Sequence, residues 1–132
     1  MKFKIKTKGH NDIINITKEV KKAALESDIQ DGLVNIFVSG STAAITAIEY
    51  EEGVIKDLQR VLEEIAPEDA DYEHHKKWGD RNGAAHIKSA LIGPDFNVPL
   101  ENGKLLLGTW QQIVLIDFDE KARERKLIVS II

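Results

Sequence analysis

The run Leu33-Val34-Asn35-Ile36-Phe37-Val38 is nearly continuous in apolar residues and rich in β-branched ones. Such a run is typical of a central strand in a sheet. Ser39-Gly40-Ser41-Thr42 interrupts it, and residues 43–48 then resume with small and β-branched side chains. We therefore predict a central strand at 33–38, a break at 39–42 and a second strand at 43–48.

Further strands are predicted from alternating and apolar runs. Residues 2–7 place Phe3, Ile5 and Thr7 on one side and lysines on the other, which favours an edge strand. Asn102-Gly103 lies between two apolar runs, and this dipeptide is a strong hairpin signal. The remaining predicted strands are 85–92, 97–100, 104–107, 113–118 and 126–132, and we expect about seven strands in all.

Two helices are predicted from apolar residues that recur at helical spacing. Asn15 or Thr17 is the expected cap of the first helix, which runs to about Ser27. The second helix takes its apolar stripe from residues 54–65 and ends before Pro67, because proline cannot continue it. Because the last strands follow one another, the order of elements favours an α+β fold: a mostly antiparallel β-sheet or sandwich with two flanking helices.

The composition limits the classes of function. No repeat or linker divides the chain, so residues 1–132 are expected to form one domain. The net charge of −4 gives no electrostatic reason to bind nucleic acid or a membrane, and neither is an expected partner. The absence of cysteine excludes disulfides, thiolate metal sites and a cysteine nucleophile. With no signal-peptide pattern and no apolar run near the roughly 20 residues that span a bilayer, we expect a cytoplasmic protein.

Residues 72–86 hold three of the four histidines. The polar residues there are His74, His75, Asp80, Asn82 and His86, and the stretch lacks the apolar period of a core element. Neutral imidazole is a good zinc ligand, and a carboxylate can complete the ligand set. A solvated loop whose histidines only cap or pair explains the spacing equally well. His75 is the weakest member, because next to His74 in an extended chain it points the other way.

Two other segments carry residues suited to a ligand. Ser41 and Thr42 follow Gly40 at a strand break, where hydroxyls and backbone N–H groups can hold a phosphate, although a plain turn is the commoner structure. Trp110 and Gln111 could form a wall for a flat ring, although a tryptophan more often packs. Basic residues flank these segments and could neutralise a phosphate or lie on a solvated surface: Arg81, Lys88, Arg123 and Arg125.

Short motifs follow one order along nearly the whole chain from about residue 12. They are Asp31-Gly32-Leu33, Phe37-Val38, Ser41-Thr42-Ala43-Ala44-Ile45, Glu49, Tyr72-x-His74, Asp80-x-Asn82-x-x-x-His86, Leu91-Ile92-Gly93-Pro94, Val98-Pro99, Asn102-Gly103, Leu107-Gly108-Thr109-Trp110-Gln111 and Asp117-x-Asp119. In this combination they resemble the YjbQ-like family of small proteins, described as secondary thiamine-phosphate synthases.

The resemblance implies a compact β-rich fold with flanking helices, and a homotrimer whose site lies near the subunit boundary. It also implies a transferase that joins a pyrimidine pyrophosphate to a thiazole phosphate, as a secondary activity beside an unsettled native role. Many relatives carry histidines where this chain has Gly40 and Ala84. Two imidazoles are therefore missing, and a divalent metal, zinc or else magnesium, would rest on His74 and His86 with Asp80 or Glu49 as acidic partner.

The expected roles follow from the motifs and the resemblance together. A small phosphorylated substrate is the expected partner. The alternatives are a metal-dependent hydrolase of a small phosphorylated compound and a non-catalytic module that binds a small anion. The expected catalytic residues are His74, Asp80, Asn82 and His86, and the expected substrate-binding residues are Ser41, Thr42, Glu49, Trp110 and Gln111.

Overall fold

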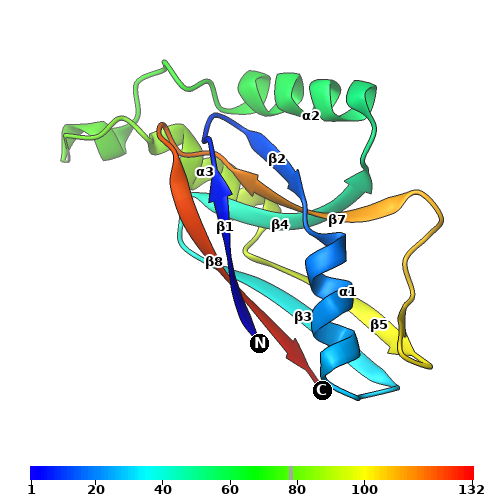
Figure 1. Ribbon diagram of the computed structural model, residues 1–132. Coiled ribbons are helices and arrows are strands. Elements are labelled where there is room, and N and C mark those ends of the chain that lie inside the picture. Colours follow the sequence, from blue (N-terminus) through cyan, green and yellow to red (C-terminus); the bar gives the residue numbers. More distant parts are fainter. Residues whose placement is uncertain (78) are drawn as a thin grey trace.

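Two antiparallel sheets form the centre of the protein. The computed structural model describes residues 1–77 and 79–132 (Figure 1). Within them, a five-stranded sheet has the order β1 (Lys2–Thr7), β8 (Arg123–Ile131), β3 (Gly32–Ser39), β5 (Asp95–Glu101) and β6 (Lys104–Leu105). A three-stranded sheet has the order β2 (Asp12–Asn15), β7 (Gln111–Asp117) and β4 (Ala43–Glu49). The predicted α+β class with antiparallel pairing is confirmed.

Strand β3 occupies the central position that its sequence predicts. It pairs with β8 on one side and with β5 on the other. Val34, Ile36 and Val38 are fully buried in the main core. Leu33 and Phe37 alternate with them and are 39% and 38% exposed, so only one face of the strand is fully covered. The nearly continuous apolar run thus supplies the core on one face and a partly apolar surface on the other.

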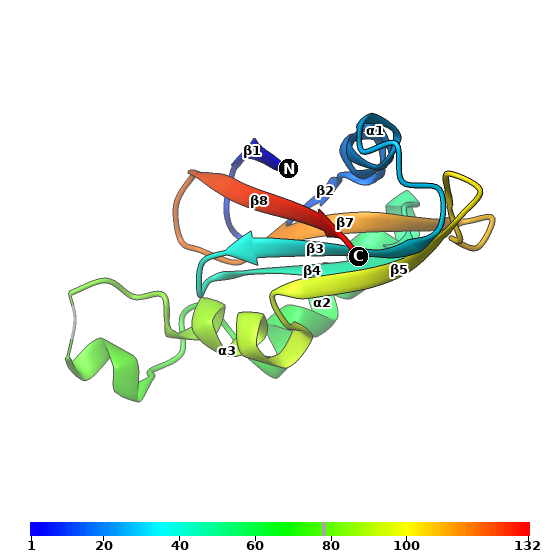
Figure 2. The ribbon, with the colours of Figure 1, turned by 90° about the horizontal axis from the view of Figure 1, so that it is seen from below.

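The three-stranded sheet lies between two apolar layers. On one side, Ile45 and Leu115 pack with the five-stranded sheet and with α1 (Thr17–Glu26) in the main core. On the other side, Ala44 and Val114 form a second core beneath α2 (Glu52–Ile65) and a third helix, α3 (Gly83–Ile92). Figure 2 shows α2 and α3 on the side of β4 that faces away from α1. The layers are therefore helix α1, two sheets, and the pair α2 and α3.

Helices α1 and α2 and the hairpin confirm the predicted pattern. The Asn15 side chain accepts a hydrogen bond from the backbone N–H of Thr17 (3.0 Å) at the start of α1. The Glu51 carboxylate accepts from two backbone N–H groups at the start of α2. Asn102 and Gly103 both have positive φ angles, 51° and 74°, in the turn between β5 and β6. The hairpin turn is confirmed, whereas the N-cap residue of α1 is Ile16, which lies between the two predicted caps, Asn15 and Thr17, and makes no side-chain cap bond.

The prediction of a strand at 85–92 is wrong, because these residues belong to helix α3. The segment Ala84-Ala85-His86-Ile87-Lys88 contains a single β-branched residue and is rich in good helix formers. Ala85 and Ser89, four residues apart, both lie on the buried face, and the Ser89 hydroxyl donates to the Ala43 carbonyl (2.6 Å). The described residues hold three α-helices instead of two. Strand β2 and the short 3₁₀ helix η1 (Glu73–Lys76) were also not expected.

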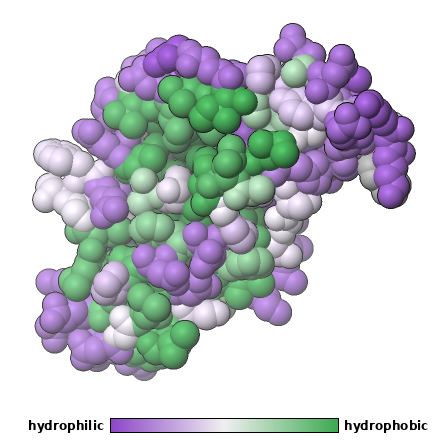
Figure 3. Space-filling model, turned by 180° about the vertical axis from the view of Figure 1, so that it is seen from behind, coloured by the Kyte–Doolittle hydropathy of each residue, from purple (hydrophilic) through white to green (hydrophobic). Residues whose placement is uncertain are grey.

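The face opposite α1 carries exposed apolar side chains. Figure 3 shows them gathered over the middle of this face. The large exposed residues of the two helices there include Ile65 on α2 and Ile87 and Leu91 on α3. Within the described residues, no helix is long and apolar enough to cross a membrane.

A buried lysine connects α3 to the rest of the fold. Lys88 is fully buried, and its ammonium group donates to the Asn11 side chain (3.1 Å) and to the Glu63 carboxylate of α2. Asn11 also donates to Glu63 (2.9 Å), and Gln59 donates to the Asn11 carbonyl (2.9 Å). This network joins α2, α3 and the turn before β2. The sequence allowed Lys88 either to neutralise a phosphate or to lie on a solvated surface. The second alternative is wrong, because Lys88 is fully buried.

We expect Lys88→Met to lower the free energy of unfolding by about 2–4 kcal/mol, because the buried Asn11 oxygen and the Glu63 carboxylate lose their cation. Urea denaturation measures this change. The matched control is Lys56→Met on α2, where Lys56 bonds Glu52 in an exposed pair that contributes little. Equal small effects of the two substitutions would contradict a role for Lys88 in holding α3.

Candidate active site

A polar pocket of about 390 Å³ lies where the break after β3 meets the start of α3 and the loop after β7. We call it the histidine pocket. Six of the predicted site residues line it: Ser41, Thr42, His74, Asp80, Asn82 and His86. Four further lining residues were not in the predicted set: Gly40, Asp119, Arg123 and Arg125.

A buried ion pair supports the pocket. Arg125 of β8 is 7% exposed, and its Nε and Nη2 donate to the two carboxylate oxygens of Asp117 at 2.7 and 2.8 Å. Its Nη2 also donates to the Thr42 hydroxyl (2.6 Å). This bidentate geometry suits the planar guanidinium and is stronger than a bond between neutral groups. Gly40 has a φ of 150°. A Cβ placed on this glycine would lie 3.0 Å from Arg125 Nη1, so little room is left for a side chain at residue 40.

Asp119 is the second buried acid of this network. Its Oδ2 accepts hydrogen bonds from the Thr42 hydroxyl (3.0 Å) and from Arg123 Nε (3.0 Å). Burial raises the pKa of Asp119, but bonds from the Glu120 N–H, Thr42 and Arg123 outweigh burial and hold the pKa below its usual value. The Thr42 hydroxyl donates to Asp119 and accepts from Arg125. It is therefore part of the ion-pair network, and only Ser41 keeps an exposed hydroxyl at the pocket.

The two histidines of the pocket lie close together. His74 comes from η1 and His86 from α3, and their ring centroids are 4.6 Å apart with the planes inclined by 59°. Burial and the neighbouring His74 lower the pKa of His86, against the opposing effects of Asp119, Asp80 and a hydrogen bond to the Ser41 carbonyl. His86 is therefore a neutral imidazole at pH 7. One ring nitrogen donates to Ser41, which leaves the other with a lone pair.

His75 does not line the pocket, but the premise of an extended chain was wrong, because residues 73–76 form the 3₁₀ helix η1. Its Nε2 accepts a hydrogen bond from the backbone N–H of Gly83 (2.9 Å), the first residue of α3. Its ring stands edge-on to Tyr72 at 5.3 Å between centroids. A Cβ at Gly83 would lie 2.6 Å from Tyr72 Cβ, so this close approach requires glycine. His75 thus holds the start of α3 and does not line the pocket.

Asn82 presents an unpaired acceptor at the pocket. It is 6% exposed and stands just before α3. Its Nδ2 donates to Asp119 (3.4 Å), and its Oδ1 is buried without a hydrogen-bond partner among residues 1–77 and 79–132. Buried polar atoms are rarely left unpaired, so this oxygen is available to a ligand or a water.

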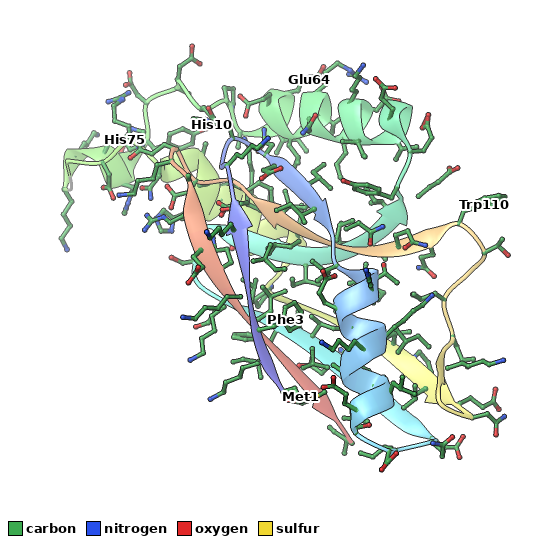
Figure 4. All side chains as sticks on the ribbon, in the orientation of Figure 1. Met1, Phe3, His10, Glu64, His75 and Trp110 are labelled. Atoms are coloured by element: carbon green, nitrogen blue, oxygen red, sulfur yellow. The ribbon has the colours of Figure 1, made fainter. Side chains whose placement is uncertain are left out.

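The structure places three predicted substrate-binding residues elsewhere. Glu49 pairs with Gln111 at the end of β4 remote from the pocket, and Trp110 precedes Gln111. Six residues of strand separate Glu49 from Ala43, which corresponds to about 20 Å. Figure 4 shows Trp110 and His75 at opposite ends of the molecule. Glu49, Trp110 and Gln111 therefore do not line the histidine pocket of the same chain.

The residues of the pocket do not complete a metal site. No group of three or more histidine, cysteine, aspartate or glutamate residues in the described part of the chain could hold a metal ion. His74 and His86 supply two imidazoles, whereas zinc takes four ligands, or three and a water. Zinc or magnesium at His74 and His86 stays a prediction, and we derive no chemical step through a metal. The alternative function, a metal-dependent hydrolase, would need a group of at least three metal ligands, and the described residues do not supply one.

Sequence signals existed for three of the four lining residues outside the predicted site set: Asp119, Arg123 and Arg125. Asp117 is the last residue of the apolar strand β7, and Asp117-x-Asp119 was among the family motifs. Arg123 and Arg125 lie two residues apart at the start of β8, so both side chains point to the same face of the strand, but the spacing does not say that this face meets the pocket. The structure shows that Arg125 is buried, whereas Arg123 stays partly exposed while bonding Asp119. The alternative of a solvated surface is wrong for Arg125.

The fold and the pocket define a class: a small α+β protein with two stacked antiparallel sheets and a polar pocket at one end. The model of the family "UPF0047 protein YjbQ-like" matches residues 1–132, and the chain belongs to this family. A UPF0047 protein of Archaeoglobus fulgidus is 36% identical over 130 residues, which cover 98% of each chain. The UPF0047 protein YugU of Bacillus subtilis is 38% identical over 118 residues, 89% of this chain and 87% of that protein.

Solved structures show the same fold. An uncharacterised YjbQ/UPF0047 protein of Clostridium acetobutylicum has 39% identity and a TM-score of 0.91 and covers 100% of this chain and 99% of its own. A protein of Sulfolobus solfataricus, described as of unknown function, has 32% identity and a TM-score of 0.91, with 99% and 95% covered. The predicted family is confirmed.

The expectation of a thiamine-phosphate synthase is wrong as an assignment. The relatives are described as uncharacterised proteins of this family or as proteins of unknown function, and none of these descriptions gives that activity. The geometry agrees with this correction. The expected ring-binding residues Trp110 and Gln111 lie at the far end of the molecule from His74 and His86.

We expect His86 to titrate below the ordinary histidine pKa and His10 above it, because Glu68 bonds and stabilises the charged His10 ring. The His86 ring binds a proton more readily in the unfolded chain than in the folded protein. As the pH falls below the ordinary histidine pKa, protonation of the unfolded chain therefore lowers the stability of the folded protein. NMR titration of the ring protons measures both pKa values. In His74→Gln the pKa of His86 should rise, since one repulsive neighbour is lost; a His86 pKa at or above that of His10 would contradict this electrostatic account.

Proposed function

We propose that the protein is an enzyme that moves a proton of a small phosphorylated substrate by general acid–base catalysis in the histidine pocket. The observation that carries the proposal is the pair of imidazoles in the pocket, His74 and His86, whose ring centroids are 4.6 Å apart. The lowered pKa of His86 suits this ring to accept a proton near pH 7. The hydrogen bond to the Ser41 carbonyl fixes the ring, as a base needs to be fixed before the reaction.

The roles of the other residues follow from their contacts. His86 accepts the proton at the ring nitrogen that does not bond Ser41. His74, with its ring centroid 4.6 Å away, is the second imidazole; it takes the proton from His86 and returns it to the substrate. The unpaired Asn82 oxygen accepts a hydrogen bond from a substrate hydroxyl and so orients it. Asp80 is the acid whose charge favours protonated His86 after the transfer.

The phosphate of the substrate is held at the other side of the pocket. Arg123 bonds Asp119 through Nε and Nη2 and is partly exposed, so its outer edge is open to an anion. The exposed Ser41 hydroxyl adds a donor next to it. Arg125 is paired with Asp117 and Arg123 with Asp119, and Asp80 adds a third acid, so the surroundings of the pocket are slightly negative before His86 is protonated. Protonation of His86 during catalysis therefore strengthens the hold on a phosphate.

Two further parts of the proposal come from the resemblance. We propose a homotrimer with the site near the subunit boundary, and the exposed apolar residues of α2 and α3 support a covered surface on that face. We also propose a cytoplasmic location. Neither part is needed for the chemistry of His86.

The experiment incubates the protein in D2O with a panel of sugar phosphates and small phosphomonoesters and follows conversion or deuterium uptake by NMR. We expect one compound or a related group to react, with the rate rising as pH increases through the pKa of His86. His86→Gln should lower this rate by about 10²–10⁴-fold. His10→Gln is the matched control, because His10 lies outside the pocket and bonds Glu68.

Two results would contradict the proposal. A rate that is the same in His86→Gln and in the wild type would remove His86 as the base. Saturable binding of a panel compound at the histidine pocket, without conversion or exchange of any compound, would make the pocket a non-catalytic binding site.

A further inference from the structure

A second pocket, of about 470 Å³, lies at the end of the molecule remote from the histidines. We call it the tryptophan pocket. Its walls include Trp110, Tyr50 and Glu49, together with Asn15 and Gln112. Trp110 is 73% exposed, and Tyr50 is partly exposed beside it. A large aromatic surface left open to water is unusual unless it serves binding.

The aromatic walls are held by local bonds. In the turn before β7, the Gly108 N–H donates to Gln111 Oε1 and the Gln111 N–H donates to the Gly108 carbonyl, both at 3.0 Å. This turn carries Trp110. The Tyr50 hydroxyl donates to the Ile13 carbonyl of β2 (3.2 Å). Gln111 therefore shapes the turn and is not itself a contact for the ligand.

The charge of the tryptophan pocket is negative. Glu49 is exposed and lies opposite Gln111 in the β4–β7 pair, so its carboxylate stands next to the turn of Trp110. Glu51 adds a second acid, although its oxygens accept from the N–H groups of Gly53 and Val54. None of the seven described residues that line the pocket is basic. An anion bound there would have no positively charged side chain among these residues to pair with.

We propose that the tryptophan pocket binds a small organic cation with a quaternary ammonium group. Such a cation is attracted to the faces of tryptophan and tyrosine rings, and a nearby carboxylate adds a charge contact. A bare metal ion is a poorer match, because the described residues offer no group of three ligands there. Trp110 and Tyr50 supply the aromatic surface for such a cation, and Glu49 and Glu51 supply negative charge beside it.

The test titrates choline into the whole protein and follows the Trp110 indole N–H signal by NMR, assigned by its loss in Trp110→Phe. We expect a saturable shift with choline and none with 3,3-dimethylbutan-1-ol, which has the same shape without the charge. Trp110→Ala lacks the reporting indole, so its choline affinity is measured by calorimetric titration beside the wild type, and it should be about 5–30-fold weaker. Glu49→Gln should weaken it several-fold, and Glu52→Gln, an exposed acid of α2 outside the pocket, should leave it unchanged.

A second arm separates the sources of the cation. It replaces choline by a short peptide with trimethyllysine, and tighter binding of the peptide would support the same site with a protein side chain as its ligand. Equal shifts with choline and with its neutral analogue would overturn the proposal. So would the absence of any choline-dependent shift, including the case in which a second copy of the chain covers Trp110.

Discussion

The bidentate pair between Arg125 and Asp117 is the interaction on which the rest of the structure depends. Asp117 ends β7 in the three-stranded sheet, and Arg125 belongs to β8 in the five-stranded sheet, so the pair joins the two sheets. Through Thr42 it also fixes the break between β3 and β4. Burying two charges is costly unless both are well bonded, and each partner here would be left uncompensated without the other. The histidine pocket forms where these three segments meet.

Much of the fold could be predicted because burial imposes a period on the sequence. The 33–38 run, the lysine alternation at 2–7 and the Asn102-Gly103 turn each have one favoured structure in water. Residues 85–92 were misassigned because a short run of alanines, isoleucine and leucine fits either element until its neighbours are known. In the fold, Ser89 and the buried Lys88 find partners only from a helix packed on β4 and α2.

The candidate site could be predicted only in part. The grouping of His74, Asp80, Asn82 and His86, together with the family resemblance, predicted a site, and the structure brings these four residues to one pocket. The exclusion of His75 could not be derived from an extended chain, because residues 73–76 form the 3₁₀ helix η1. The inward direction of Arg125 could not be predicted, because a strand begins there after a charged loop. The distance between Trp110 and the histidines could not be predicted either, because it depends on the pairing of β4 with β7. This pairing sets Gln111, next to Trp110, opposite Glu49 at one end of β4, and Asp117 opposite Ala43 at the other end. The two proposals assign opposite ligands to the two ends of the molecule: a phosphate beside His86 and an organic cation beside Trp110.

The most direct test of the central claim is the pKa of His86 in Arg125→Lys, measured by NMR. Lysine keeps the charge but cannot bond Asp117 and Thr42 together, so we predict a loss of about 1–3 kcal/mol in stability. We also predict that the pKa of His86 rises toward the ordinary value, because the loosened 39–42 segment admits water and relieves the burial that lowers this pKa. A His86 pKa that stays at its wild-type value while stability falls would show that the ion pair does not hold the pocket, and would contradict the account.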